Sequence, residues 1–565
     1  MRRMQILRVL ILTAAAVLIG RLYYVQVMQN QVYRDQADRQ YVRRGQALFD
    51  RGTIYFSPRN GPPISAATLA AGYTMALEPK KIEHPENAFN TLIGILSVDQ
   101  PELLAKIGTE KTYVEIAKRL DEKTAKRVVN LGMAGVSVYR ERWRFYPGGR
   151  SAANVLGFVG FQDDGVTLAG SYGLERYYND ILVRDSSGMY VNFFAKIFSG
   201  VSNVFEKGGG VGGDIVTSIE PSVEQELERK IASVETAWKS NLVGGIIMDP
   251  KSGEIYAMAV TPSFDPNDFA GEKDSAVFGN SLIDRVYEMG SIIKPLTMAA
   301  GLDAGVITPE STYTDYGFVL SNGAKISNFD GKARGTVPVQ EILNQSLNTG
   351  MAFVALKLGN EKLTKYFKSY GFGEETGIDL PGETHGLIKN LDSPRDIEHA
   401  TAAFGQGIAM TPIETVRALS ALGNGGTLPN PHIVKRIDYI TGISKTLSYE
   451  NTKRVFSPET SEAITRMLVE VVDKALLNGT VRQERYSIAA KTGTAQMALE
   501  DGRGYYEDRY LHSFFGYFPA YDPRFIIFLY TVYPKGAQYA SHTLTMPFID
   551  LVKFLITYYD IPPDR

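Results

Sequence analysis

Five short apolar segments are the clearest pattern in the chain from residue 243 onward. They are residues 243–248, 254–260, 487–496, 511–518 and 525–532. The first two and the last two segments flank turn-forming sequences, DPKSG and PAYDP, so each pair is predicted to form a β-hairpin. With the segment at 487–496, the hairpins predict an antiparallel sheet. Helices between the hairpins and at 546–559 can cover its faces.

The region 39–221 has a different pattern. It mixes short strands with polar segments that predict helices, among them 102–106 and 112–127, and it contains no recognisable catalytic set. Residues 207–213 are rich in glycine and predict a loop or hinge. Because 565 residues exceed the usual length of one domain, the chain is predicted to be an α+β protein of several domains.

The N-terminus carries one topological signal. Residues 9–20 are uninterruptedly apolar or small, and residues 22–28 extend this stretch weakly. The apolar core is short for a membrane span and suits a signal peptide, but no small-x-small cleavage site follows it, and terminal arginines can reach the membrane surface. We therefore expect an uncleaved transmembrane signal anchor over residues 1–28, with a cleaved signal as the alternative. Arg2, Arg3 and Arg8 favour a cytoplasmic N-terminus.

Composition narrows the chemistry. The chain has no cysteine, which excludes disulfides, thiol catalysis and thiolate metal ligands. No two of its six histidines have metal-ligand spacing and none has a Ser-His-Asp context, so no metal or cofactor is expected. His512 is interpreted as a packed or solvated strand residue. A net charge of −2 gives no electrostatic reason to expect nucleic-acid binding. If the chain has a catalytic base, lysine is therefore the candidate, because the histidines lack a catalytic context.

Three short motifs carry the candidate chemistry. In chain order they are Ser291-Ile292-Ile293-Lys294, Ser346-Leu347-Asn348 and Lys491-Thr492-Gly493. Singly, such motifs are usually a solvated helix face, a turn and a strand end. Jointly, in this order and in these local settings, they favour the active site of a serine acyltransferase.

The first motif has the spacing that nucleophilic catalysis requires. A serine hydroxyl becomes a useful nucleophile when a positioned base takes its proton. Residues three apart share a helix face, so the Lys294 amine can reach Ser291. Pro295 suits only the first turn of a helix, which predicts a helix that begins close to Ser291, behind Gly290. The helix dipole would then favour an anionic transition state at this serine.

The second motif is predicted to lie in a tight connector. Residues 340–345 are expected to end one helix and residues 351–358 to begin the next. Ser346 and Asn348 can then present a hydroxyl and an amide to a cleft.

The third motif is predicted to lie in a strand, whose small residues let a peptide lie along its edge. Lys491 would supply positive charge to a substrate carboxylate there, and Thr492 and Thr494 would supply hydroxyls. The backbone N–H groups of Ser291 and Thr494 are the expected oxyanion hole.

Longer segments around these motifs resemble class B penicillin-binding proteins, the monofunctional peptidoglycan transpeptidases. The similar segments are residues 243–267, 287–297, 404–412 and 489–496, with residues 145–160 and 170–177 similar to the family's non-catalytic pedestal. The resemblance implies a penicillin-binding (serine transpeptidase) fold at 226–565, with an antiparallel sheet flanked by helices. It also implies an extended pedestal domain at 29–225 and the membrane anchor at 1–28.

The resemblance also implies a reaction. The enzyme would attack a D-Ala-D-Ala bond of a peptidoglycan stem peptide, release D-alanine and pass the acyl group to an amine of a neighbouring stem. β-Lactams would inhibit it covalently. By this resemblance Ser291 would form the acyl-enzyme and Lys294 would take its proton. Ser346 would relay a proton to the leaving amine, and Asn348 would position both the lysine and the substrate amide. The carboxylate side of the substrate would be bound by Lys491, Thr492, Gly493 and Thr494.

Location and partners follow from the same resemblance. It implies a single-pass protein of the bacterial inner membrane, with its catalytic domain facing the periplasm or extracytoplasmic space. Asn348 in the second motif is similar to division-type enzymes, whereas elongation-type relatives often carry Asp there. The implied partners are a SEDS-family glycosyltransferase and divisome membrane proteins, and no nucleic acid.

The chain departs from the family pattern at two places. The family's Arg-Gly-x-Ile-x-Asp-Arg-Asn-Gly corresponds to residues 51–61, which carry two additional residues and lack the aspartate. A Gly-Gly loop near the last strand is replaced in the region by Tyr539-Ala540-Ser541-His542.

Several alternatives share the motifs. They are an elongation-type transpeptidase, a D,D-carboxypeptidase, a β-lactamase, and a non-catalytic β-lactam sensor or division scaffold. The pedestal and the anchor count against a β-lactamase. The intact motifs count against a scaffold, and the lack of a cytoplasmic signalling domain before the anchor counts against a sensor.

Overall fold

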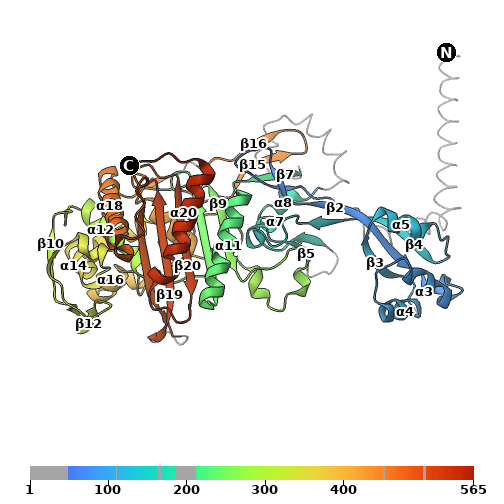
Figure 1. Cartoon of the computed structure of the whole chain (residues 1–565), viewed down its shortest axis with the longest axis horizontal. Helices are drawn as coiled ribbons and strands as arrows, with labels where there is room; N and C mark the ends of the chain where they lie inside the picture. Colours follow the sequence, from blue (N-terminus) through green and yellow to red (C-terminus); the bar gives the residue numbers. More distant parts are fainter. Residues whose placement is uncertain (1–48, 110, 163–166, 185–211, 450–451, 500–503) are drawn as a thin grey trace, which may run out of the picture. The chain divides into compact units, whose positions relative to one another are not determined.

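The computed structural model describes residues 49–565, except 110, 163–166, 185–211, 450–451 and 500–503 (Figure 1). The predicted signal anchor at 1–28 and nearly all of the glycine-rich loop at 207–213 therefore lie outside the described residues. Within the described part, no helix has the length and apolarity that a membrane crossing needs.

The described residues form two compact units. The smaller contains Leu69–Trp143, and the larger contains Arg51–Thr68, Arg144–Asp163 and Thr167–Arg565. The predicted boundary between 225 and 226 falls inside one helix of the larger unit, α11 (Pro221–Trp238). The extents of the pedestal and the transpeptidase domain stay predictions.

The smaller unit is a three-stranded sheet with three helices. Its strands are β2 (Ile64–Leu77, from Leu69 onward), β3 (Val114–Leu120) and β4 (Val136–Phe145), and its helices are α3 (Pro85–Ile93), α4 (Gln100–Ile107) and α5 (Glu122–Val129). Strand β2 pairs with both β3 and β4. Apolar side chains from the strands and helices, including Met75, Leu103 and Val128, form one buried cluster.

The polar helix predicted at 112–127 is wrong, whereas the one at 102–106 corresponds to α4. Residues 112–127 contain all of β3 and most of α5. The change of element occurs at Asp121, whose side chain accepts a hydrogen bond from the Thr124 N–H at 2.6 Å and so caps α5. Such a cap begins a new helix and cannot lie inside one that is already running. The many charged residues of this segment hid the short strand.

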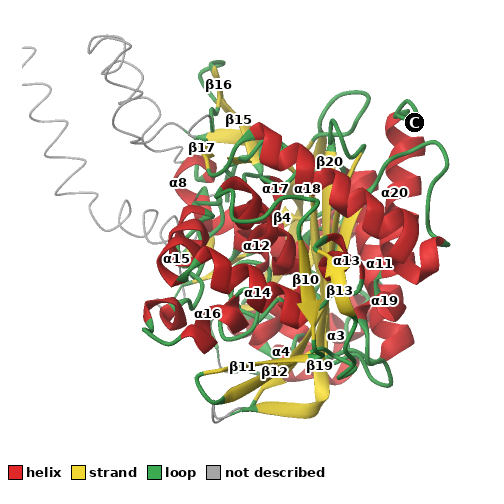
Figure 2. Ribbon diagram, turned by 90° about the vertical axis from the view of Figure 1, so that its left-hand side faces the viewer, coloured by secondary structure: helices red, strands yellow, loops and turns green. Residues whose placement is uncertain are grey.

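The larger unit is built on a five-stranded antiparallel sheet (Figure 2). Its strands, in spatial order, are β18 (Ala489–Ala498), β19 (Tyr505–Phe518), β20 (Phe525–Val532), β8 (Leu242–Met248) and β9 (Ile255–Thr261). Both predicted hairpins are present, β8–β9 and β19–β20. Strand β18, which carries the third motif, is the edge strand next to β19, and no strand of the described residues pairs with its other edge, the open edge of the sheet.

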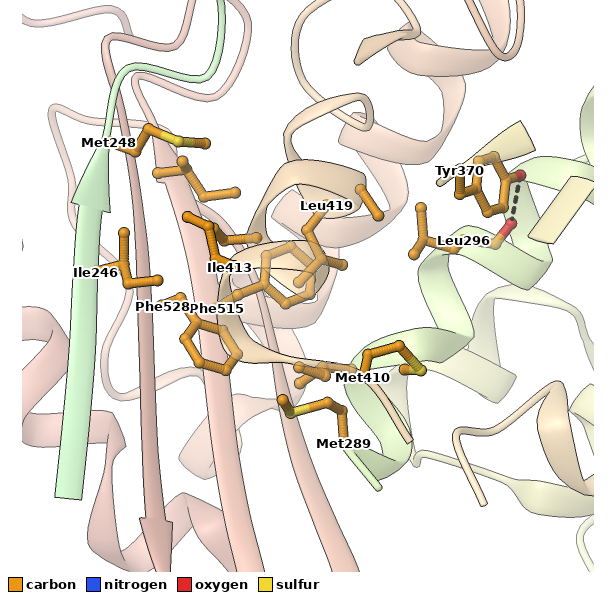
Figure 3. Packing of buried hydrophobic residues seen from close by; sticks show 14 of the residues in the cluster. Ile246, Met248, Met289, Leu296, Tyr370, Met410, Ile413, Leu419, Phe515 and Phe528 are labelled. Atoms are coloured by element: carbon orange, nitrogen blue, oxygen red, sulfur yellow. Dashed lines mark hydrogen bonds between the residues drawn. The ribbon is translucent and has the colours of Figure 1, made fainter. Parts of the chain in front are cut away.

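Helices cover both faces of this sheet, because consecutive strand side chains point to opposite sides. Ile246, Phe515 and Phe528 belong to one buried cluster (Figure 3), whereas their neighbours Ile247, Phe514 and Ile527 belong to another. Helices α12 (Lys294–Asp303), α14 (Asn348–Leu358), α17 (Pro412–Ser420) and α18 (Pro458–Glu470) contribute to the first cluster; α11 and α20 (Thr545–Tyr559) contribute to the second. Every residue of β20 is therefore buried.

A second sheet in the larger unit lies next to a buried ion cluster. Strands β16 (Ser444–Thr446), β15 (Val434–Tyr439), β7 (Gly213–Thr217) and β1 (Ile54–Phe56) follow in that order, and β1 pairs in turn with the first residues of β2. Just before β1, Arg51 contacts Glu175 with Nε at 2.5 Å from Oε2, and Arg144 contacts the other carboxylate oxygen, also at 2.5 Å. The Glu175 side chain is fully buried. Arg51 thus holds the start of β1 to the helix α7 (Gly173–Tyr177).

Candidate active site

Ser291 lies in a short 3-10 turn, Gly290–Ile293, directly before α12. The α-helix itself begins at Lys294, with Pro295 in its first turn as predicted. Gly290 has φ 63°, and its N–H donates to the Gly405 carbonyl at 3.1 Å. A Cβ at Gly290 would lie 2.9 Å from the Thr494 carbonyl oxygen. Glycine therefore lets the turn that carries Ser291 approach strand β18 closely.

The Lys294 amine is fully buried and bonded to the second motif. Its Nζ donates to the Ser346 carbonyl at 2.5 Å and to Asn348 Oδ1 at 2.8 Å, and it lies 3.2 Å from Ser346 Oγ. Burial lowers the pKa of Lys294 well below the usual lysine value, and the positive charge of Lys491 lowers it further. A neutral amine with an available lone pair is what a general base requires.

The connector between α13 (Gln340–Asn344) and α14 holds Ser346 in an unusual backbone conformation. Ser346 has φ 55°, in the left-handed region that residues with a side chain seldom occupy. Helix α14 then begins at Asn348, three residues earlier than predicted. Strained residues of this kind concentrate at functional sites because surrounding contacts must hold them. The two bonds from Lys294 to Ser346 are such contacts.

The Lys491 amine reaches the same serine from strand β18. Its Nζ lies 3.1 Å from Ser346 Oγ and 3.0 Å from the Thr492 carbonyl oxygen. Burial lowers the pKa of Lys491 to about 7. The Ser346 hydroxyl therefore bridges two buried amines, neither of which has a carboxylate partner among the residues that the structure describes. A hydroxyl that contacts two titratable amines can pass a proton between them.

The structure does not join Ser291 to Lys294 by a hydrogen bond, contrary to the direct contact that their spacing suggested. In the described part of the chain the Ser291 hydroxyl has no hydrogen-bond partner, and the amine of Lys294 is directed at Ser346 and Asn348 instead. Catalytic hydrogen bonds are often formed only once substrate is bound. The unpartnered hydroxyl is free to rotate toward the base.

Gly493 of the third motif and the following residue, Thr494, have different structural roles. A Cβ at Gly493 would lie 2.3 Å from Ser513 Oγ and 2.7 Å from the Met289 carbonyl, which are themselves hydrogen-bonded at 2.8 Å. Gly493 thus leaves room for the bond that fixes β19 to the segment before the nucleophile. The Thr494 hydroxyl accepts from the Ala540 N–H at 3.1 Å and keeps its own proton for another acceptor.

Strand alternation separates Lys491 from its threonine neighbours. Ala489 packs in the cluster of α12, and Ala490 packs in the cluster of α20. With a period of two, Lys491 faces the side of α12, whereas Thr492 and Thr494 face the other side. A ligand at the open edge of β18 would meet groups from both faces.

A buried carboxylate that the sequence did not predict supports the second motif. Asp315 Oδ1 accepts from the Thr349 hydroxyl at 2.8 Å, and Asp315 Oδ2 accepts from Asn328 Nδ2 at 2.9 Å. Asn348 in turn donates its amide to the Ser327 carbonyl at 3.1 Å. These contacts fix the first turn of α14, so Asn348 Oδ1 stays directed at Lys294. No local motif marks Asp315, because its partner Thr349 lies 34 residues away.

A second contact missed by the sequence reasoning lies just before Ser291. Glu288 accepts from the Gly407 N–H and from the Tyr505 hydroxyl, both at 3.0 Å, and ties the nucleophile segment to a loop and to β19. His512 is packed, as expected: it is fully buried, its Nδ1 lies 2.9 Å from Thr543 Oγ1, and burial lowers its pKa to about 4.

Comparison with known families agrees with this geometry. Residues 243–550 match the penicillin binding protein transpeptidase domain, and residues 49–193 match the penicillin-binding protein dimerisation domain. The chain is 32% identical over 543 residues to Stage V sporulation protein D of Bacillus subtilis, covering 94% of this chain and 81% of that protein. It is 25% identical over 568 residues to the peptidoglycan D,D-transpeptidase FtsI of Escherichia coli K12, covering 98% and 91%.

Solved structures show the same fold. Penicillin binding protein 2X from Streptococcus thermophilus gives a TM-score of 0.72 at 20% identity, covering 91% of this chain and 81% of that one. Penicillin binding protein 3 from Mycobacterium tuberculosis, without ligand, gives a TM-score of 0.65 at 25% identity, and the match covers 75% of this chain and 92% of that one. The family match extends over more than half of the chain and includes all three motifs. The chain therefore belongs to the class B penicillin-binding proteins and is a serine-type peptidoglycan D,D-transpeptidase.

Proposed function

We propose that this transpeptidase cross-links stem peptides through an acyl-enzyme on Ser291, with Lys294 as its base. The observation that carries the proposal is the Lys294 amine, which is buried, has a depressed pKa and lies beside Ser346 and Asn348. In the first step Ser291 Oγ bonds to the carbonyl carbon of the penultimate D-alanine, and its proton passes to Lys294. The backbone N–H groups of Ser291 and Thr494 stabilise the oxyanion.

Collapse of this intermediate breaks the peptide C–N bond. The proton on Lys294 reaches the leaving nitrogen through the Ser346 hydroxyl, and D-alanine departs as an amine. Lys491 keeps positive charge near this hydroxyl, and Thr492, Gly493 and Thr494 form the edge that receives the substrate carboxylate. In the second step an acceptor amine attacks the ester, gives its proton to the same relay and releases Ser291.

The test is mass spectrometry of the full chain after incubation with a penicillin. We expect one adduct, located on Ser291, and none in Ser291→Ala. Ser346→Ala is the matched control, since it removes a hydroxyl from the same centre and should retain a slowly formed adduct on Ser291. An adduct on Ser346 would contradict the assignment.

The lifetime of the adduct separates the alternatives of the same fold. A transpeptidase or a D,D-carboxypeptidase retains the penicilloyl ester for long periods, whereas a β-lactamase hydrolyses it within the assay. Release of D-alanine with and without an acceptor amine then distinguishes carboxypeptidation from cross-linking. A sensor or scaffold would release no D-alanine from a stem peptide.

We further infer two things about the cellular role. The protein takes part in septal cell-wall synthesis, and it does so while anchored in the bacterial inner membrane. The asparagine of the second motif and the similarity to FtsI support a division role, and the sequence of residues 1–28 supports a single span with the catalytic domain outside the cytoplasm. The partners would be a SEDS-family glycosyltransferase and divisome membrane proteins. Resistance to a high-salt wash and digestion by external protease in spheroplasts test the anchor; a mature N-terminus near residues 23–31 would contradict it.

A second cellular role has one specific observation in its favour. The relative at 32% identity is named for stage V of sporulation. A sporulation role predicts that depletion blocks spore formation and leaves vegetative septa intact. Division arrest on depletion would favour the septal role.

A further inference from the structure

Phe404 lies beside the Lys294 amine and belongs to none of the three motifs. Lys294 Nζ lies over its ring, 6.0 Å from the ring centroid. Phe404 follows helix α16 (Asp396–Ala402) by two residues, and both Phe404 and Lys294 are buried. The ring is therefore part of the apolar wall that surrounds the amine.

Two hydrogen bonds fix the backbone on either side of this ring. The Thr297 hydroxyl donates to the Ala403 carbonyl at 2.8 Å, and the Gly290 N–H donates to the Gly405 carbonyl at 3.1 Å. Thr297 belongs to α12, one helical turn after the base, and Gly290 belongs to the turn that carries the nucleophile. A Cβ at Gly405 would lie 2.2 Å from the Gly290 carbonyl oxygen, so glycine permits this close approach. The segment 403–405 is thus held to both catalytic elements.

The other groups around the amine leave burial as the main influence on it. Strand β18 contributes the positive charge of Lys491, whereas the connector and α14 present the neutral groups of Ser346 and Asn348. Among the described residues no other charge contributes to the lowered pKa of Lys294, and burial is the larger of the two causes. Burial acts because an ammonium loses its hydration. Whatever keeps water away from this amine therefore controls its readiness to accept a proton.

An aromatic ring acts on a neighbouring amine in two opposite ways. Its π-electron face attracts an ammonium and so favours the charged form, within a distance of about 6 Å from the ring centroid. Its apolar body excludes water and so favours the neutral form. At 6.0 Å the attraction is at the end of its range, whereas the exclusion of water requires only that the ring closes the wall. The second effect should prevail at Phe404.

We propose that Phe404 is a positioning residue that acts through Lys294: its ring shields the amine from water and thereby keeps it neutral in the free enzyme. The inference rests on the proposed function, in which Lys294 takes the proton of the Ser291 hydroxyl. Without the shield, water would hydrate and stabilise the ammonium form. An amine that already carries this proton has no lone pair with which to accept the one from Ser291 Oγ.

The test is the pH dependence of Ser291 acylation by a penicillin, measured in the full chain and in variants of Phe404. Phe404→Ala opens the wall to water, so the midpoint of the pH profile should move upward. The rate at neutral pH should fall about tenfold for each pH unit of this shift, and the plateau at high pH should approach that of the unchanged chain. Phe404→Leu keeps an apolar wall without a π system, so its midpoint should stay close to that of the unchanged chain.

Phe367→Ala is the matched control for lost packing. Phe367 lies on α15 (Asn360–Ser369), is buried in the same cluster, and packs its ring against Tyr370 and Phe372. Its replacement should lower the free energy of unfolding, as that of Phe404 does, but should leave the midpoint unchanged. If Phe404→Ala does not fold, Phe404→Val removes less of the side chain and should show a smaller upward shift.

Two results would overturn the proposal. One is an unchanged midpoint in the folded alanine or valine variant, because a lower rate alone would show only lost packing. The other is a downward shift in Phe404→Leu, since the ring would then act chiefly by attracting the ammonium. If the unchanged chain forms no adduct on Ser291, the proposed function itself fails. An adduct on Ser291 with one midpoint common to all variants removes only the role of Phe404.

Discussion

Two buried clusters in the larger unit, one around Glu175 and one around Ser346, place charged side chains in opposite ways. Around Glu175, two arginines contact one carboxylate, and every charge has an opposite partner within 2.5 Å. Around Ser346, two lysines contact one neutral hydroxyl, and neither has a carboxylate partner in the part of the chain that the structure describes. Paired buried ions keep their charges and hold elements together, whereas unpaired like charges lose protons. The comparison teaches that burial beside another amine, with no counter-ion among the described residues, is what lowers the pKa of Lys294 and suits it to the proposed role of base.

The strongest way to break the comparison is to give the active-site cluster a permanent charge. Lys294→Arg keeps the charge and much of the length of the side chain, but arginine does not lose its proton in proteins. We expect acylation by a penicillin to slow by roughly 10²–10⁴-fold, the usual effect of removing a general base. Stopped-flow acylation kinetics measure this.

The matched control for Lys294→Arg is Lys491→Arg, which should cost less because Lys491 mainly supplies charge. If Lys294→Arg acylates at the unchanged rate and Lys491→Arg does not, the roles of the two lysines are reversed.

The next largest effect is expected from removing the counter-ion of the paired cluster. Glu175→Gln leaves the guanidinium groups of Arg51 and Arg144 buried without a negative partner. Breaking a buried ion pair in this way lowers the free energy of unfolding by about 3–5 kcal/mol. Chemical denaturation measures the loss, and the acylation rate of the protein that remains folded should not change. A slower acylation at unchanged stability would show that this cluster also serves catalysis.

A smaller effect should appear in the pH dependence of acylation. The rate should rise with pH as Lys294 loses its proton, because only the neutral amine is a base. Lys491→Met removes the positive charge that helps to lower the pKa of Lys294, so the midpoint should move upward. Lys491→Arg retains the charge and should leave the midpoint nearly in place. A downward shift in Lys491→Met would mean that the two amines are not electrostatically coupled as described.

The smallest effect is expected at a solvent-exposed ion pair, which sharpens the contrast with Glu175. Lys368 Nζ lies 3.0 Å from Asp392 Oδ1, and both side chains are more than half exposed. Solvent and salt screen such pairs, so Asp392→Ala should lower the unfolding free energy by no more than about 1 kcal/mol. Chemical denaturation of Asp392→Ala under the conditions used for Glu175→Gln measures this loss. If the two variants lost equal unfolding free energy, burial could not explain why the Glu175 cluster is expected to matter more.

The fold of the larger unit was predictable where its signals are local. The apolar runs at 243–248 and 525–532 identify strands because they are short and bounded by turn residues, and both hairpins are confirmed. The start of α14 was predicted three residues late, because nothing in the sequence announces the left-handed conformation of Ser346. The helix predicted at 112–127 failed for a related reason, since the signal at Asp121 was read as one charge among many.

The candidate site was predictable in its residues and less so in its contacts. The three motifs taken together identified Ser291 and Lys294, but the first contacts of the Lys294 amine are Ser346 and Asn348, more than 50 residues away. The support from Asp315 was not predictable for the same reason, because a single carboxylate on another strand carries no pattern. Residues that come together only through the fold, such as Lys294 and Ser346, produce no local motif or periodic pattern in the sequence.

The open edge of β18 has a consequence for solubility. An unpaired strand edge is a template on which a second chain can add a strand and start aggregation. This edge has to remain open if a peptide is to lie along it, so no covering helix or loop can protect it. Its central residues are Thr492, Gly493 and Thr494, which offer an incoming strand little apolar surface. Substitutions that add apolar bulk here are expected to reduce the yield of soluble protein before they change the chemistry.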